Sequence, residues 1–149
     1  VDFVDGFAML LNKKKFKEEI YFDENFFMYL ENNDLCKRVA DREGSVFVVP
    51  TSKINHLAAK AVDSRFAEEV EFSRNWHWIW SKFYFNKKHY GLFKAAKEGT
   101  LRYFLSILKF LFYFLINDKV KKKIYFNRAS GFYNALLGKS SWYRPRLDD

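Results

Sequence analysis

Residues 22–38 read FDENFFMYLENNDLCKR and gather carboxylates beside a run of aromatic side chains. The chain as a whole is basic, with a formal net charge of +8, so this acidic stretch needs a physical reason. Apolar pairs at i,i+4 spacing run through residues 35–40, and Gly44 is a good helix stop. The spacing predicts a helix that begins near Asn33, with Glu31 just before it and Asp34 in its first turn.

The composition bounds the class of protein. The 149 residues suffice for one ordinary domain, and 49% hydrophobic with 30% charged residues is typical of a globular chain. The basic balance favours an anionic partner, which is nucleic acid, an acidic membrane surface or a phosphorylated ligand. Cys36 is the single cysteine, so no internal disulfide forms. The first residues show no signal peptide and no initiator methionine, which suggests a fragment of a longer chain.

Short β-rich runs flank the acidic stretch. Residues 7–11 are apolar and predict a buried strand, and residues 45–49, SVFVV, predict a second one. Residues 53–57, KINHL, predict a further extended piece. An apolar face at i, i+3, i+4 and i+7 predicts a helix over residues 73–90, ended by Gly91. We therefore expect a mixed α and β unit up to this glycine.

The composition changes after this unit. Residues 101–116, LRYFLSILKFLFYFLI, are almost wholly apolar but fall short of the roughly 20 residues that span a bilayer. Two interpretations stay open: a helix packed on the domain, or a helix in a membrane interface with lysines on anionic head groups. The tail from residue 131 predicts a loop or a short helix. The basic residues that flank the apolar segment are Lys94, Lys97, Lys119, Lys121, Lys122 and Lys123.

The acidic stretch suggests a chemistry. A helix N-terminus favours a negative charge by about 0.3–1 kcal/mol, so Glu31 and Asp34 are expected to stay ionised. An ionised carboxylate beside an aromatic-lined cleft can take a proton from a hydroxyl, and aromatic faces suit the apolar faces of sugar rings. The alternative is that both acids cap the helix, with Phe26 and Phe27 in the core.

The order of the motifs resembles the second half of the catalytic domain of family 2 glycosyltransferases. These inverting enzymes of the GT-A fold move a sugar from a nucleotide diphosphate sugar to an acceptor hydroxyl. The matching pieces are VDGFAMLLNKKKF (4–16), the acidic stretch (22–38), GSVFVVPTSKINH (44–56) and SKFYFNKKHYG (81–91). The last piece looks like a segment of rhamnosyltransferase-like members.

The resemblance implies an α/β class, the GT-A-type nucleotide-diphospho-sugar transferase fold. Residues 1–91 would be only its C-terminal portion, with few strands and several helices, and residues 92–149 a helical, basic and apolar extension. The implied function is part of an inverting glycosyltransferase for cell-surface glycan synthesis, with rhamnose as the suggested donor sugar. The acceptor would be a polysaccharide or a lipid-linked glycan. The implied location is cytoplasmic, on the inner face of the cell membrane, with peripheral contact through residues 92–123.

The resemblance also implies site residues. A carboxylate of the acidic cluster is the catalytic base in the family, but Asn32 occupies the usual aspartate position and an amide cannot take a proton. Glu31 and Asp34 are the remaining candidates, and Glu31 is preferred because it precedes the helix and can point into the cleft. The acceptor-binding candidates are Gly6, Phe26, Phe27, Tyr29 and Asn32.

The donor side involves fewer residues. His56 resembles the family's histidine near the metal or the diphosphate, and Arg74 and Lys87 could meet the diphosphate. The cofactor would be Mg²⁺ or Mn²⁺, with its main ligands in a preceding half, because the 149 residues contain no Asp-x-Asp motif and no glycine-rich phosphate loop. We therefore expect the chain to be inactive alone.

Two other functions compete. A non-catalytic basic and aromatic module could bind nucleic acid or a membrane, since stacking aromatics and lysines hold single strands. Against nucleic acid, the aromatic residues fall on apolar helix faces and the acidic cluster would repel phosphate, so no nucleic acid partner is expected. The third hypothesis is a degenerate transferase, which the asparagine at position 32 would allow.

Overall fold

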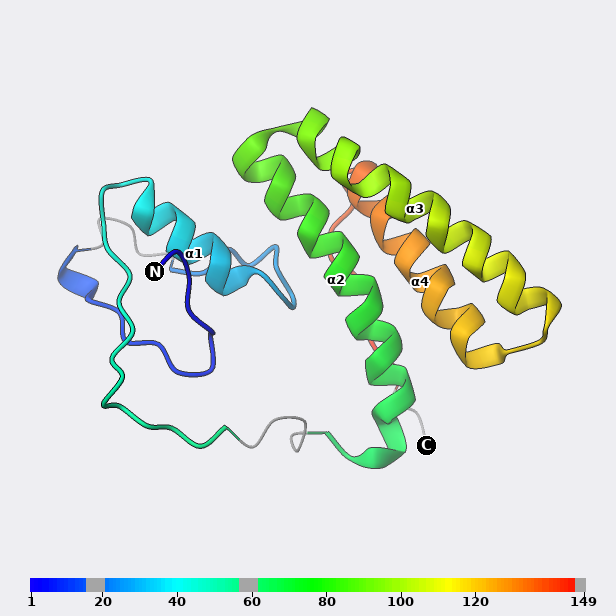
Figure 1. The fold of residues 1–149 in the computed structure, drawn as a ribbon, viewed down its shortest axis with the longest axis horizontal. Helices are drawn as coiled ribbons and strands as arrows, with labels where there is room; N and C mark the ends of the chain where they lie inside the picture. The colour runs from blue at the N-terminus through cyan, green and yellow to red at the C-terminus, as the bar shows by residue number, and fades with distance from the viewer. Residues whose placement is uncertain (16–20, 57–61, 147–149) are drawn as a thin grey trace.

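A computed structural model describes residues 1–15, 21–56 and 62–146. Its elements are helical: η1 (Lys13–Lys15), α1 (Glu31–Ala40), η2 (Ser64–Phe66), α2 (Ala67–Tyr90), α3 (Leu92–Leu115) and α4 (Lys119–Leu136). The three long helices α2, α3 and α4 pack side by side, and α1 lies on the other side of α2 with the N-terminal segment (Figure 1). No strand occurs among the described residues.

The predicted α/β class, and with it the GT-A fold, is therefore wrong for this structure. Residues 7–11 and 45–49 are neither paired nor buried as strands, and the side chains of Leu10, Phe47 and Val49 are exposed. A strand is stable only when a neighbouring strand takes up its backbone hydrogen bonds, and the described chain offers none to either run. The β-rich composition of these runs favours an extended backbone, but no neighbouring strand in the described chain pairs with them.

The predicted helices, unlike the predicted strands, are present in the structure. The helix expected over residues 73–90 is confirmed as the larger part of α2, and it ends at Gly91, whose φ of 88° suits glycine. The helix predicted from about Asn33, within the acidic stretch, is α1, which begins two residues earlier, at Glu31. The polar run NKKKFKEEI at residues 12–20 is typical of a short helix or a turn; Lys13–Lys15 of it form η1, and residues 16–20 lie outside the described part of the chain.

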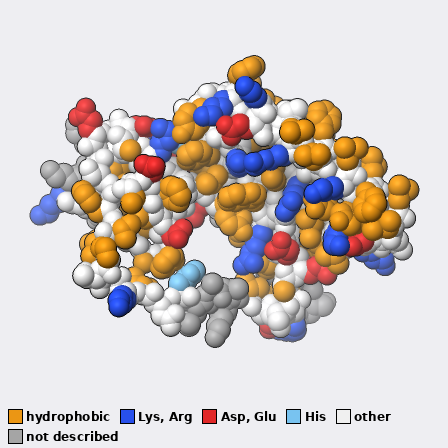
Figure 2. Space-filling view, in the orientation of Figure 1, with side chains coloured by type: hydrophobic (Ala, Val, Ile, Leu, Met, Phe, Trp, Pro, Cys, Tyr) orange, Lys and Arg blue, Asp and Glu red, His pale blue; other side chains and the backbone are white. Residues whose placement is uncertain are grey.

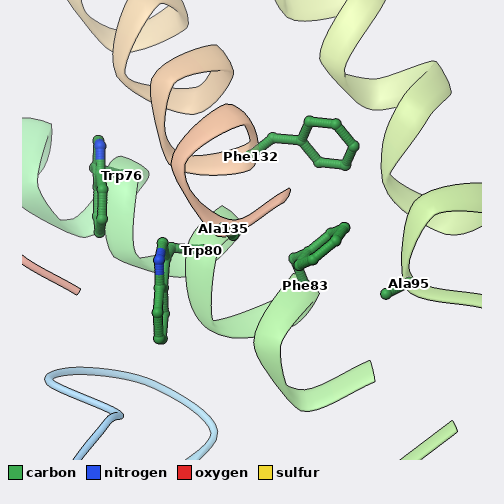
Figure 3. Close-up of a cluster of buried hydrophobic side chains, with 6 residues drawn as sticks. All are labelled: Trp76, Trp80, Phe83, Ala95, Phe132 and Ala135. Carbon is green, nitrogen blue, oxygen red and sulfur yellow. The ribbon is translucent and has the colours of Figure 1, made fainter. Parts of the chain in front are cut away.

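Aromatic packing between α2 and the two helices that follow it forms the core. Trp76, Trp80 and Phe83 of α2 are buried, and Phe83 meets Phe132 of α4 edge to face at 5.4 Å (Figure 3). Gly131 lets the two backbones approach, because a Cβ there would lie 2.5 Å from the Trp76 carbonyl oxygen.

Buried hydrogen bonds tie the N-terminal part to this core. The Ser81 hydroxyl of α2 donates to the Met28 carbonyl at 2.7 Å, and the Ser141 hydroxyl donates to the Asn25 carbonyl at 2.7 Å. The Tyr84 hydroxyl donates to the Asp23 carboxylate at 3.0 Å. These bonds fix the turn before α1 against α2.

Candidate functional site

A hollow of about 580 Å³ opens between the N-terminal segment, the turn before α1 and the middle of α2. Figure 2 shows an opening in this part of the surface. Most of the site residues predicted on the acceptor side lie here. The lining residues are Phe3, Asp5, Gly6, Phe7, Tyr29, Leu30, Glu31, Asn32, Asn33, His56 and Trp78.

The turn that leads into α1 is strained. Tyr29 and Leu30 have φ values of 69° and 67°, in the left-handed region that bulky residues rarely adopt, at a cost of roughly 1–3 kcal/mol each. The Tyr29 ring packs edge-on against Trp78 at 5.4 Å, and burial raises the pKa of its hydroxyl. Such strain persists only where the surroundings hold it, and here it sets the wall of the hollow.

Glu31 is one of two carboxylates that line the hollow, the other being Asp5. The Glu31 Oε2 atom is buried and has no hydrogen-bond partner among the described residues. A buried polar atom without a partner is rare in folded proteins, because its lost hydration is not replaced. Because Glu31 lines the hollow, a rotation of its side chain can turn the unpaired oxygen towards a hydroxyl group that enters there.

Asn32 and Gly6 build the wall beside Glu31. The Asn32 amide is buried and donates to the Val4 carbonyl at 2.6 Å, which fastens the N-terminal segment to α1. A Cβ at Gly6 would lie 3.5 Å from the Asn32 Cβ and 4.0 Å from the Glu31 Oε1 atom. A larger side chain at Gly6 would therefore stand against both residues.

Asp34 lies elsewhere and is fully buried. Its carboxylate accepts hydrogen bonds from Arg38 Nε at 2.9 Å and His89 Nε2 at 2.8 Å, and Lys88 Nζ lies at 2.7 Å. Burial would raise the pKa of Asp34, but the hydrogen bonds from Lys88, Arg38 and His89 outweigh it and hold the pKa below its ordinary value. With its oxygens engaged in these contacts, Asp34 holds α1 against α2 and does not line the hollow.

The two predicted aromatic residues before Tyr29 do not line the hollow. Phe26 is buried and meets Tyr84 edge-on at 4.9 Å. Phe27 packs on the His77 ring at 4.8 Å, and the Arg144 guanidinium lies 3.6 Å from its centre. Both phenylalanines therefore support the packing around α2.

Arg74 and Lys87 lie too far apart on α2 to bind the same diphosphate. They lie thirteen residues apart on α2, which is about 20 Å along a helix that rises 1.5 Å per residue. Arg74 lies one turn from Trp78, on the side of the hollow, and its charge acts on Tyr29. Lys87 is exposed in the last turn of the helix.

His56 lies at the edge of the hollow, where its ring stacks on Phe7 at 4.5 Å and an angle of 5°. Asp5 also lines the hollow, but no group of three His, Cys, Asp or Glu residues in the described chain could hold a metal ion. The residues in place do not by themselves fit the predicted Mg²⁺ or Mn²⁺. The groups of the hollow that can bind or react are therefore its own side chains.

Trp78 is one of the six lining residues that the motifs did not identify, and the only one of them on α2. It lies off the apolar face that Trp76, Trp80 and Phe83 form, and its side chain is 43% exposed. Its position in the sequence could have identified it, because a tryptophan on the polar side of an amphipathic helix is not buried in the core and is a candidate for binding a ligand. It marks the side of α2 that faces the hollow.

The chain matches no protein-family model, no curated protein and no solved structure. The resemblance to glycosyltransferases therefore depends on the motifs in the sequence.

Proposed function

We propose that this chain supplies the acceptor side of an inverting glycosyltransferase, with Glu31 as the general base. One observation carries the proposal: five residues that the motif pattern assigns to the acceptor or the donor side line one hollow. They come from three separate segments of the chain and are Gly6, Tyr29, Glu31, Asn32 and His56. The proposal concerns this site and not the GT-A fold.

The transfer is a single displacement. The acceptor hydroxyl enters the hollow, and the Glu31 side chain turns its unpaired oxygen to within hydrogen-bond reach of it, about 2.6–3.2 Å. Glu31 takes the proton as the hydroxyl oxygen attacks the anomeric carbon. The bond from that carbon to the diphosphate breaks, its electron pair leaves on the diphosphate oxygen, and the configuration inverts.

The aromatic wall suits a sugar acceptor. Tyr29 and Trp78 meet edge to face and border the hollow, so their apolar surfaces can cover the C–H face of a sugar ring. Rhamnose as donor sugar and a cell-surface polysaccharide or lipid-linked glycan as acceptor remain proposals from the motif resemblance. Arg74, one turn from Trp78, is the cation we assign to the diphosphate.

A donor panel tests the class of reaction. The protein translated from the complete reading frame is mixed with nucleotide diphosphate sugars, with and without glycan acceptors, and the release of nucleoside diphosphate is measured. We expect acceptor-dependent release with one donor.

A hollow-filling variant ties the reaction to this site. Gly6→Leu sets a side chain against Glu31 and Asn32, so acceptor-dependent release is expected to fall at least tenfold. Ala8→Leu changes an exposed neighbour that does not line the hollow, and it should keep full release. Equal release by both variants would contradict an acceptor site in the hollow.

A further inference from the structure

The outward side of α3 is an apolar stripe that nothing in the described chain covers. Its members recur every three or four residues, so they lie on one side of the helix. Their exposed fractions run from 46% to 80%. The stripe consists of Leu101, Phe104, Leu105, Leu108, Leu111, Phe112 and Leu115.

The opposite side of α3 already has its packing partners. Ala95 and Ser106 are buried there, and Tyr103 packs against the core with Phe132. The helix is therefore apolar on both sides, whereas a surface helix of a globular protein usually turns a polar side outward. An exposed apolar face of this length indicates a surface that binds something.

Basic residues surround the stripe. Residues 92–123 contain eight basic and two acidic residues, which is a net charge of +6 out of +8 for the whole chain. Lys94 and Lys97 are exposed at one end, and Lys119 is exposed near the other end. In Figure 2, Lys and Arg side chains lie among hydrophobic side chains over this part of the molecule.

The two acidic residues of this segment are engaged elsewhere. The Glu98 carboxylate accepts a hydrogen bond from the Asn86 amide at 2.9 Å, and the Asp118 side chain accepts one from the Lys121 backbone N–H at 2.9 Å. A second copy of the chain, laid on the stripe in either direction, would bring lysine ends against lysine ends. The charge pattern therefore disfavours a self-complementary pair and suits an anionic surface.

We propose that α3 docks on an anionic membrane surface and lies in its plane, with the apolar stripe among the acyl chains and the lysines at both ends on the head groups. No helix of the described residues is long and apolar enough to cross a bilayer. The stripe from Leu101 to Leu115 is about 21 Å long at 1.5 Å per residue, a length that fits an in-plane helix. This inference does not depend on the proposed sugar transfer.

Vesicle flotation of the unaltered protein is the first test. Vesicles of phosphatidylcholine alone are compared with vesicles that contain 30% phosphatidylglycerol by design, roughly the range where polybasic segments respond to anionic lipid. We expect binding to the anionic vesicles at low salt and a fall of at least tenfold at high salt, since screening weakens lysine contacts. Absence of binding to the anionic vesicles at low salt would overturn the proposal.

Variants of exposed and half-buried residues separate the apolar contribution to binding from that of the lysine charges. Leu108→Gln with Phe112→Gln should weaken binding by about tenfold for each apolar side chain lost. Lys119→Glu with Lys122→Glu should weaken it by about 100-fold or more, because each lysine near an anionic surface contributes about fivefold. This pair spares Lys123, which is bound to Glu69.

A control variant and one competing outcome complete the test. Phe47→Gln removes a still more exposed aromatic side chain that is not part of α3, and its binding should equal that of the unaltered protein. Loss of vesicle binding by Phe47→Gln but not by the α3 variants would overturn the proposal. It would also be overturned by a dimer that forms without vesicles and dissociates on Leu108→Gln, because the stripe would then serve a second copy.

Discussion

Replacing Asp34 by asparagine is expected to destabilise the protein, whereas replacing Glu31 by glutamine is not. The Asp34 carboxylate is fully buried and contacts Arg38 Nε, Lys88 Nζ and His89 Nε2 at 2.7–2.9 Å. Asparagine keeps the shape of the side chain but removes the charge that these groups share. Glu31 has a buried oxygen without a partner among the described residues, so the cost of burying its charge offsets the gain of about 0.3–1 kcal/mol at the helix N-terminus, and glutamine should change little.

The contacts of Asp34 set the size of the effect. Removing one partner of a buried ion pair costs about 3–5 kcal/mol, because the remaining charge stays buried without a counter-ion. Lys88 keeps a second contact with the Asp23 carboxylate at 2.7 Å, which places the expected loss near the lower end, at about 3 kcal/mol. With a urea slope of about 2 kcal/mol/M, the midpoint of unfolding falls by about 1.5 M.

Urea unfolding followed by tryptophan fluorescence measures this loss. Asp41→Asn is the matched control, since Asp41 directly follows the same helix and pairs with Lys37 at an exposed position. The midpoints of Asp41→Asn and Glu31→Gln should equal that of the unaltered protein. An Asp34→Asn midpoint equal to the controls would refute the role assigned to Asp34.

Gly131, Asp23 and Trp78 give further predictions on stability, acid sensitivity and acceptor binding. Gly131→Ala should cost about 1–3 kcal/mol in urea unfolding, since its methyl group meets the Trp76 carbonyl. In acid, burial tends to raise the pKa of Asp23, but bonds from Lys88 and its other neighbours lower it to about 2. The ionised Asp23 therefore contributes folding stability at any pH above 3.8, the ordinary pKa of an aspartate. This contribution is lost as the pH falls towards 2, and acid unfolding followed by circular dichroism should record the loss. Acceptor oligosaccharides should change the fluorescence of Trp78, so Trp78→Phe removes the response and Trp142→Phe, equally exposed, keeps it.

Local patterns predicted the helices well. The spacing of Trp76, Trp80 and Phe83 identified the buried face of α2, and Gly91 identified its end. The strands failed because pairing is not a local property: residues 45–49 favour an extended chain, but the described residues offer no neighbour. The start of α4 also has a local signal, since Asp118 caps it by accepting a hydrogen bond from the backbone N–H of Lys121, the third residue of the helix.

The site was partly visible in the sequence. The motif order brought out Glu31, Tyr29 and Asn32, which line the hollow together. The sequence could not show which of Glu31 and Asp34 is held in a structural ion-pair cluster. The groups that bind Asp34 include Lys88 and His89, which are more than fifty residues away in the chain. Distant partners of this kind are known only once the chain is folded.

The central claim is that Glu31 takes the proton of the acceptor hydroxyl. The most direct test is the acceptor-dependent release of nucleoside diphosphate by Glu31→Gln, with Glu24→Gln as an exposed control from the same stretch. Loss of a general base predicts a fall of about 10²–10⁴-fold in kcat with donor binding unchanged, and full activity in the control. Full activity of Glu31→Gln would contradict the claim.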